Sequence, residues 1–143
     1  IGVTILMHCD FVYSTKDTKF LLPFVNLGLC PEAASSILIP LNSNMLIAKE
    51  KLLLGEPFDP IEALNMGIVS KIYDAEKEML EATSEIAKKI CNLPSSSVSI
   101  TKKLINQTFK EMIKNRILME GQKLFELLHS DEAKTAFSKF LKN

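Results

Sequence analysis

CDFVYSTKDTKFLLPFVNLGLCPEAASS, residues 9–36, is the stretch that decides the fold. Residues 10–14 and 19–27 are rich in β-forming side chains, and a turn-like TKD separates them, so two short strands are expected. Pro23 limits the second strand to an edge or an interrupted piece, because proline has no N–H to donate to a neighbouring strand. The stretch therefore predicts strands that are short and near the start of the chain.

A helix is expected to begin at Pro31 and to run to about Ile39. Proline suits the first helical position because its missing N–H would be unpaired there in any case. Glu32 would then lie in the first turn, where the helix dipole favours a negative charge. Two interpretations stay open: an ordinary acid at a helix start, or a catalytic base with apolar neighbours in Phe24 and Leu29.

The rest of the chain reads mainly as helices. Residues 1–9 have the apolar character of a buried helix, and residues 68–73 predict a short strand. Further helices are expected over residues 45–54, from Asp59 to Gly67, and over 75–91, 96–108, 111–129 and 130–141. The run Asn42-Ser43-Asn44, the pair Asp59 and Glu62, and Ser130 are the expected N-terminal caps. Strands therefore come early and helices late.

Composition excludes several classes of protein. The 143 residues contain 17 Lys and Arg and 17 Asp and Glu, so no single-sign charge points to nucleic acid. No apolar run is long enough to predict a membrane span. Cys9, Cys30 and Cys91 are widely spaced and odd in number, which favours a reduced intracellular compartment over a disulfide framework. His8 and His129 lack partners at metal-ligand spacing, so no metal site is predicted.

The order and spacing of particular residues along the chain resemble the sequence pattern of the enoyl-CoA hydratase/isomerase (crotonase) superfamily. Residues 9–36 and the later segment LLLGEPFDPIEALNMGIVSKIY, residues 52–73, follow the family pattern in order and spacing. The matching positions are Cys9, Asp10, Phe20, Pro23, Gly28, Pro31, Gly55, Ala63, Gly67 and Val69. The resemblance implies an α/β fold: residues 1–73 as the remainder of the ββα spiral core and 74–143 as a helical region that forms trimers. Since the chain starts without methionine, as if inside a folded element, it is expected to be the C-terminal portion of a longer protein.

The acids then indicate a reaction class. Hydratases of the family use two glutamates, and the matching positions here are Thr4 and Phe24, neither of which can activate water. Glu32, directly after Pro31, matches instead the base of the Δ3,Δ2-enoyl-CoA isomerases. The resemblance thus implies an isomerase that shifts the double bond of 3-enoyl-CoA to 2-enoyl-CoA.

The resemblance also assigns the remaining site positions. Ile1 would supply a backbone N–H of an oxyanion hole, and Leu22, Phe24 and Leu29 would line the acyl pocket. Phe140 and Lys142 would touch coenzyme A from a neighbouring subunit, although an amphipathic tail packing on its own chain is an equal reading of both. The implied substrate is a fatty acyl-CoA, coenzyme A being part of the substrate and not a cofactor.

Further expectations and alternatives follow from the same resemblance. The assembly would be a homotrimer or hexamer, in a peroxisome or mitochondrion of a eukaryote or in the cytoplasm of a bacterium. A crotonase-like module that binds acyl-CoA or a protein without turnover is one alternative. Another crotonase reaction, using residues outside this chain, is the second.

Overall fold

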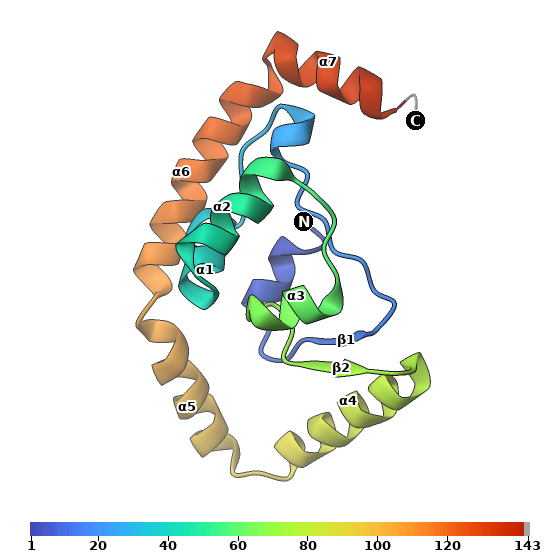
Figure 1. Cartoon of the computed structure of the whole chain (residues 1–143). Helices are drawn as coiled ribbons and strands as arrows, with labels where there is room; N and C mark the ends of the chain where they lie inside the picture. The colour runs from blue at the N-terminus through green and yellow to red at the C-terminus, as the bar shows by residue number, and fades with distance from the viewer. Residues whose placement is uncertain (142–143) are drawn as a thin grey trace.

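A computed structural model describes residues 1–141, in which short strands and 3₁₀ helices come first and long helices last (Figure 1). The first half consists of η1 (Thr4–His8), β1 (Tyr13–Thr15), η2 (Val25–Leu27), α1 (Ser35–Asn42), α2 (Met45–Leu54), α3 (Pro60–Asn65) and β2 (Lys71–Tyr73). The second half consists of α4 (Glu76–Cys91), α5 (Ser95–Gln107), α6 (Lys110–Leu128) and α7 (Asp131–Phe140). The α/β class expected from the sequence is confirmed.

The buried core lies in the first half of the chain. β1 and β2 form a parallel pair in which Tyr13 is opposite Lys71. Most of the buried core side chains come from the loops and short helices between these strands. They are Phe20, Leu22, Phe24, Ile39, Ala48, Phe58, Ala63, Met66, Ile68 and Val69. This core fixes the segment that carries Leu22 and Phe24, and it therefore fixes one wall of the candidate site.

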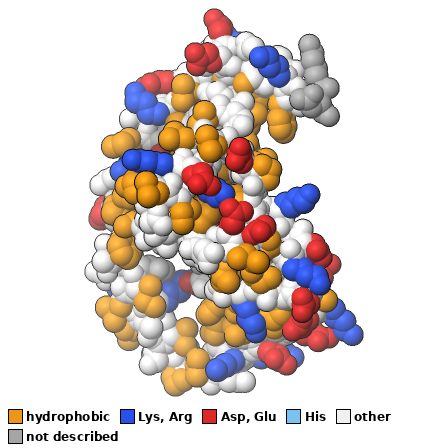
Figure 2. Space-filling view, in the orientation of Figure 1, with side chains coloured by type: hydrophobic (Ala, Val, Ile, Leu, Met, Phe, Trp, Pro, Cys, Tyr) orange, Lys and Arg blue, Asp and Glu red, His pale blue; other side chains and the backbone are white. Residues whose placement is uncertain are grey.

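The helices of the second half curve around this core (Figure 1). α4 packs on the two strands, α6 packs on α1, and α7 packs on η2. α4 and α5 have no buried residue, whereas α6 buries Glu120 and α7 buries Ala133. Hydrophobic side chains consequently remain exposed along α5 and α6, at the left edge of the face in Figure 2.

The helix caps predicted from local sequence are confirmed. The Asn44 side chain accepts from the N–H groups of Leu46 and Ile47 at 3.0 Å each. Asp59 and Glu62 form the reciprocal capping box of α3. Ser130 Oγ accepts from the N–H of Ala133 at the start of α7. Each cap satisfies backbone donors that have no partner inside the helix.

Three local predictions are wrong. The strand expected over 19–27 is a single antiparallel bridge at Phe20 followed by η2, since Pro23 has no N–H with which to continue a ladder. The buried helix expected over 1–9 is the 3₁₀ helix η1, whose buried residue is Thr4.

The third error concerns Glu32. α1 begins at Ser35, so Pro31 does not open it and Glu32 lies in the turn before the helix. Ala33 and Ala34 adopt left-handed backbone conformations, with φ of 56° and 60°, which interrupt any helix from Pro31. A contact from α6, described below, stabilises this turn.

Gly28 holds α7 against η2. Its φ is 70°, and a Cβ there would lie 2.9 Å from the backbone of Ala133. Gly28→Ala is therefore expected to lower the free energy of unfolding by about 2–3 kcal/mol, from left-handed strain and displacement of α7. Gly121→Ala, inside α6 with no atom within 4 Å of the new Cβ, should raise it by about 1 kcal/mol. Chemical denaturation measures both, and equal effects of the two changes would contradict this packing.

Lys51 is a buried cation between α2 and α3. Its ammonium lies 2.6 Å from Glu62 Oε1 and 3.2 Å from Glu50 Oε1. The Glu62 carboxylate holds the pKa of Lys51 above its ordinary value despite burial. In turn, Lys51 and the backbone N–H of Asp59 hold the pKa of Glu62 below its ordinary value. The pair thus favours the charged form of both groups.

Glu62→Gln keeps the capping box but removes the charge, so it tests the pair. Because Glu62 is 44% exposed, the expected loss is at most about 1 kcal/mol of unfolding free energy near neutral pH. Because the pKa of Glu62 is lowered in the folded protein, its ionisation stabilises the fold at pH values above the ordinary pKa of 4.5. This stabilisation is lost as the pH falls through the pKa of Glu62 in the folded protein. Because the pKa of Lys51 is raised in the folded protein, its protonation stabilises the fold at pH values below the ordinary pKa of 10.5. This stabilisation is lost as the pH rises through the pKa of Lys51 in the folded protein.

The difference between wild type and Glu62→Gln, measured by denaturation across pH, should therefore form a plateau at neutral pH and disappear in acid. Glu81→Gln is the matched control, because Glu81 forms only an exposed pair with Lys77 at 3.9 Å. A difference that stays constant into strong acid would exclude the ion pair as its cause.

Candidate active site

Glu32 lies in the turn between η2 and α1, at the wall of a cavity of about 620 Å³. Its side chain is 22% exposed, so it is partly sheltered by the cavity and not in bulk solvent. Most of the lining is apolar and comes from four parts of the chain. The apolar lining residues are Ile1, Val3, Leu21, Leu22, Pro23, Phe24, Leu27, Leu29, Leu124 and Phe137. Among the lining residues that the structure describes, Glu32 is the one carboxylate.

Thr4 contacts Glu32 directly. Thr4 is buried in η1, and its hydroxyl donates a short hydrogen bond to Glu32 Oε1. The carbonyl oxygen of Ile1 lies farther from the same hydroxyl, at 3.3 Å, so the carboxylate is the nearer acceptor. The backbone nitrogen of Ile1 is 3.5 Å from Glu32 Oε1. Thr4 of η1 therefore presents a hydroxyl to the carboxylate, and Ile1, three residues before it, lies close by with its main-chain nitrogen.

The turn that carries Glu32 is held from two sides. On one side, the carboxylate of Glu120 in α6 accepts from the N–H of Ala34 at 2.6 Å and of Ser36 at 3.0 Å. On the other side, His8 Nε2 lies 2.7 Å from the carbonyl oxygen of Ala33. A carbonyl oxygen only accepts, so Nε2 carries the proton in this contact. Two successive left-handed alanines cost conformational energy, which these contacts offset.

The cavity brings together five of the predicted site residues: Ile1, Leu22, Phe24, Leu29 and Glu32. The buried Leu22 and Phe24 belong also to the hydrophobic core, and Leu29 is half-buried. Whether these residues bind an acyl chain stays a prediction. Their placement means that the Glu32 carboxylate lies beside apolar side chains, which shelter it partly from water.

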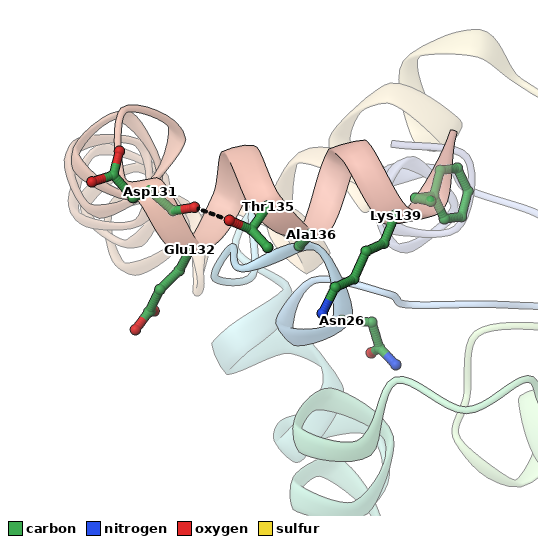
Figure 3. Close-up of a pocket in the computed structure, with 7 residues that line it drawn as sticks. Asn26, Asp131, Glu132, Thr135, Ala136 and Lys139 are labelled. Carbon is green, nitrogen blue, oxygen red and sulfur yellow. Dashed lines mark hydrogen bonds between the residues drawn. The ribbon is translucent and has the colours of Figure 1, made fainter. Parts of the chain in front are cut away.

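Phe140 does not line this cavity. It is 59% exposed and lines a separate groove of about 640 Å³ between η2 and α7. Figure 3 shows Lys139 extending across this groove toward Asn26, with Asp131 and Glu132 at its other end. Lys142 lies outside the described residues. Phe137, one turn before Phe140, is the α7 aromatic that faces the Glu32 cavity.

Sequence reasoning missed Glu120. The residue is 6% exposed, although most of α6 is exposed. A signal was present: Glu120 lies three residues after Ile117 and four before Leu124, on the apolar stripe of the helix. A single acid at such a position indicates a buried hydrogen-bonding role. His8, read as structural or surface, is exposed and bonds to Ala33.

The described chain has neither a metal-binding cluster nor a membrane-spanning helix. Across residues 1–141, no group of three or more His, Cys, Asp or Glu side chains is arranged to hold a metal ion. In the same residues, no helix combines the length and apolar character needed to cross a membrane.

Comparison with known proteins identifies relatives that share this architecture. Enoyl-CoA delta isomerase 2 of Rattus norvegicus is 34% identical over 113 residues, which cover 79% of this chain and 29% of the rat protein. The short-chain-enoyl-CoA hydratase of Clostridium acetobutylicum is 26% identical over 140 residues, covering 98% of this chain and 53% of that protein.

The fold is shared with solved structures. The crystal structure of an enoyl-CoA hydratase/isomerase from Pseudoalteromonas atlantica T6c superposes with a TM-score of 0.93 at 35% identity. This superposition covers 99% of the chain and 56% of that structure. The chain thus spans about half the length of that structure and of the clostridial relative. The family model described as Enoyl-CoA hydratase/isomerase matches residues 1–143, so the chain belongs to the enoyl-CoA hydratase/isomerase family.

Proposed function

We propose that the protein containing this chain converts 3-enoyl-CoA to 2-enoyl-CoA, with Glu32 as the base. One observation carries the proposal: Glu32 is the one carboxylate among the described residues that line a mostly apolar cavity, in which Thr4 and Lys19 are the other side chains with polar groups. An isomerisation within one acyl chain needs one group that takes a proton and gives it back. A partly enclosed carboxylate meets that need.

Glu32 can carry out both proton transfers of the isomerisation. Glu32 removes a proton from the carbon next to the thioester carbonyl, and the electron pair moves into a dienolate. The same carboxyl group then returns the proton to the carbon two positions further along, which leaves the double bond conjugated with the carbonyl. The apolar walls from Leu22, Phe24 and Leu29 limit exchange of the proton with water, and a base held beside the bound acyl chain makes the transfer intramolecular.

The positions of Thr4 and Phe24 favour isomerisation over hydration. By the family resemblance these are the places where hydratases carry glutamates, and both residues line the Glu32 cavity. Thr4 uses its hydroxyl to donate to Glu32, and Phe24 is apolar, so neither acts as a base toward water. Addition of water across a double bond would lack its usual pair of acids here.

Ile1 is the proposed donor to the thioester oxygen. Its backbone nitrogen lies at the cavity, close to the Glu32 carboxylate. An N–H of this kind, aimed at the oxygen that gains charge, contributes about 3 kcal/mol to transition-state stabilisation. Phe140 and Lys142 as coenzyme A contacts, and a trimer or hexamer that brings them to a neighbouring site, belong to the same proposal.

Glu32→Gln tests the base directly. The amide is nearly isosteric but takes up no proton, so kcat for conversion of 3-enoyl-CoA in the complete protein should fall by at least about 100-fold, with KM changed by less than about threefold. Steady-state kinetics with a 3-enoyl-CoA, read as formation of the conjugated 2-enoyl thioester, gives both values.

Glu56→Gln is the control, because Glu56 is an exposed acid outside the cavity and should leave both constants unchanged. Near-normal turnover of Glu32→Gln would remove Glu32 as the base. Acyl-CoA binding without turnover by the wild-type protein would point instead to a binding module. Hydration of 2-enoyl-CoA faster than isomerisation would point to a different reaction of the family.

A further inference from the structure

Glu120 makes three contacts that bracket Glu32 in sequence. Its carboxylate accepts from the N–H groups of Ala34 and Ser36, one on each oxygen. Its carbonyl oxygen lies 3.8 Å from the thiol of Cys30. Burial raises the pKa of that thiol, and so favours the S–H form that can donate. Contacts therefore reach residues on both sides of Glu32 from a single residue of α6.

The carboxylate also replaces a missing helix cap. α1 has no side-chain cap of its own, since its N-cap residue is Ala34. The Ser36 N–H belongs to the first turn of α1, where backbone donors lack partners inside the helix. A buried carboxylate at this end satisfies such donors and interacts favourably with the helix dipole. Glu120 thus fixes where α1 begins.

The left-handed pair makes the position of Glu32 depend on this contact. Ala33 and Ala34 have φ of 56° and 60°, a conformation that alanine rarely adopts without support from its surroundings. If the support from α6 were lost, the turn could relax toward helical geometry and carry the Glu32 side chain with it. The side chain would then leave its place beside Thr4 at the cavity wall.

We propose that Glu120 is a positioning residue of the active site, which acts through the turn 33–36 to hold the Glu32 carboxylate at the cavity. The inference rests on the proposed role of Glu32 as base. Glu120 does not line the cavity and so touches no bound substrate in this chain. Its effect on the reaction is geometric.

The test compares Glu120→Gln with Glu126→Gln in the complete protein. Gln keeps the shape of the side chain, but its NH₂ group faces one of the two backbone N–H groups, so one hydrogen bond is lost. Since a displacement of about 1 Å can cost roughly 100-fold in rate, kcat should fall about 10- to 100-fold while KM stays within about twofold. Glu126 is on the same helix, but its side chain is 61% exposed and bonds to Lys123, so Glu126→Gln should change neither constant.

Hydrogen exchange provides a readout that does not depend on catalysis. In wild type, the amides of Ala34 and Ser36 should be protected, and in Glu120→Gln they should exchange faster while the amides of the α6 interior do not. Should Glu120→Gln fail to fold, Glu120→Asp, which keeps the charge but has a shorter reach, replaces it. Unprotected Ala34 and Ser36 amides in the wild-type protein would overturn the inference without any variant.

The remaining outcomes separate the two proposals. Faster exchange at Ala34 and Ser36 with an unchanged kcat would overturn the positioning role and leave the isomerase proposal in place. Thermal unfolding measures the folded fraction of each variant. A fall in kcat that is no larger than the fall in this fraction would also overturn the positioning role. A wild-type protein that binds 3-enoyl-CoA without isomerising it would refute the proposed function itself.

Discussion

The contact between a buried carboxylate of α6 and the backbone before α1 is the constraint on which the candidate site depends. Glu120 satisfies two backbone N–H groups that neither the turn nor α1 satisfies on its own. An unpaired buried N–H costs about 1–3 kcal/mol, so losing this acceptor would weaken both the turn and the helix start. The same contact fixes α6 against α1, and so links the second half of the chain to the first.

One wall of the cavity is also part of the hydrophobic core. Leu22 and Phe24 are core side chains packed within the first half, and they also face Glu32. Leu124 and Phe137 complete the lining from α6 and α7. Because each half supplies part of the lining, the environment of the carboxylate depends on the packing between the halves. The family relationship is established by sequence and fold, while the reaction proposed here follows from the chemistry of this cavity.

Features set by near neighbours could be predicted from the sequence. The caps at Asn44, Asp59 and Ser130 involve partners within three residues, so the local pattern contains all the information that they need. The α/β class and the family were implied by the resemblance of ten ordered positions along residues 9–73 to the family pattern. The placement of Glu32 in a first helical turn was wrong for the opposite reason. The start of α1 is set by Glu120, which is more than 80 residues away.

The site residues also differ in whether their contacts are with residues close in sequence or far away. The family resemblance implied that Leu22, Phe24 and Leu29, which are close to Glu32 in sequence, line a pocket beside it, and all three line the cavity in the structure. The Thr4 hydroxyl has a local partner in the carbonyl oxygen of Ile1 at 3.3 Å, but its nearer acceptor is the Glu32 carboxylate, 28 residues further along the chain. The residues next to Thr4 in sequence do not indicate this partner.

The separation between Ala34 and Glu120 has a consequence for biogenesis. The hydrogen bond between them joins residues 86 positions apart, so the entropy of closing that loop must be overcome before the contact stabilises the fold. During synthesis the ribosome must release α6 before the turn can take its final shape. A nascent chain that stops within α5 lacks Glu120, so the N–H groups of Ala34 and Ser36 have no acceptor from α6.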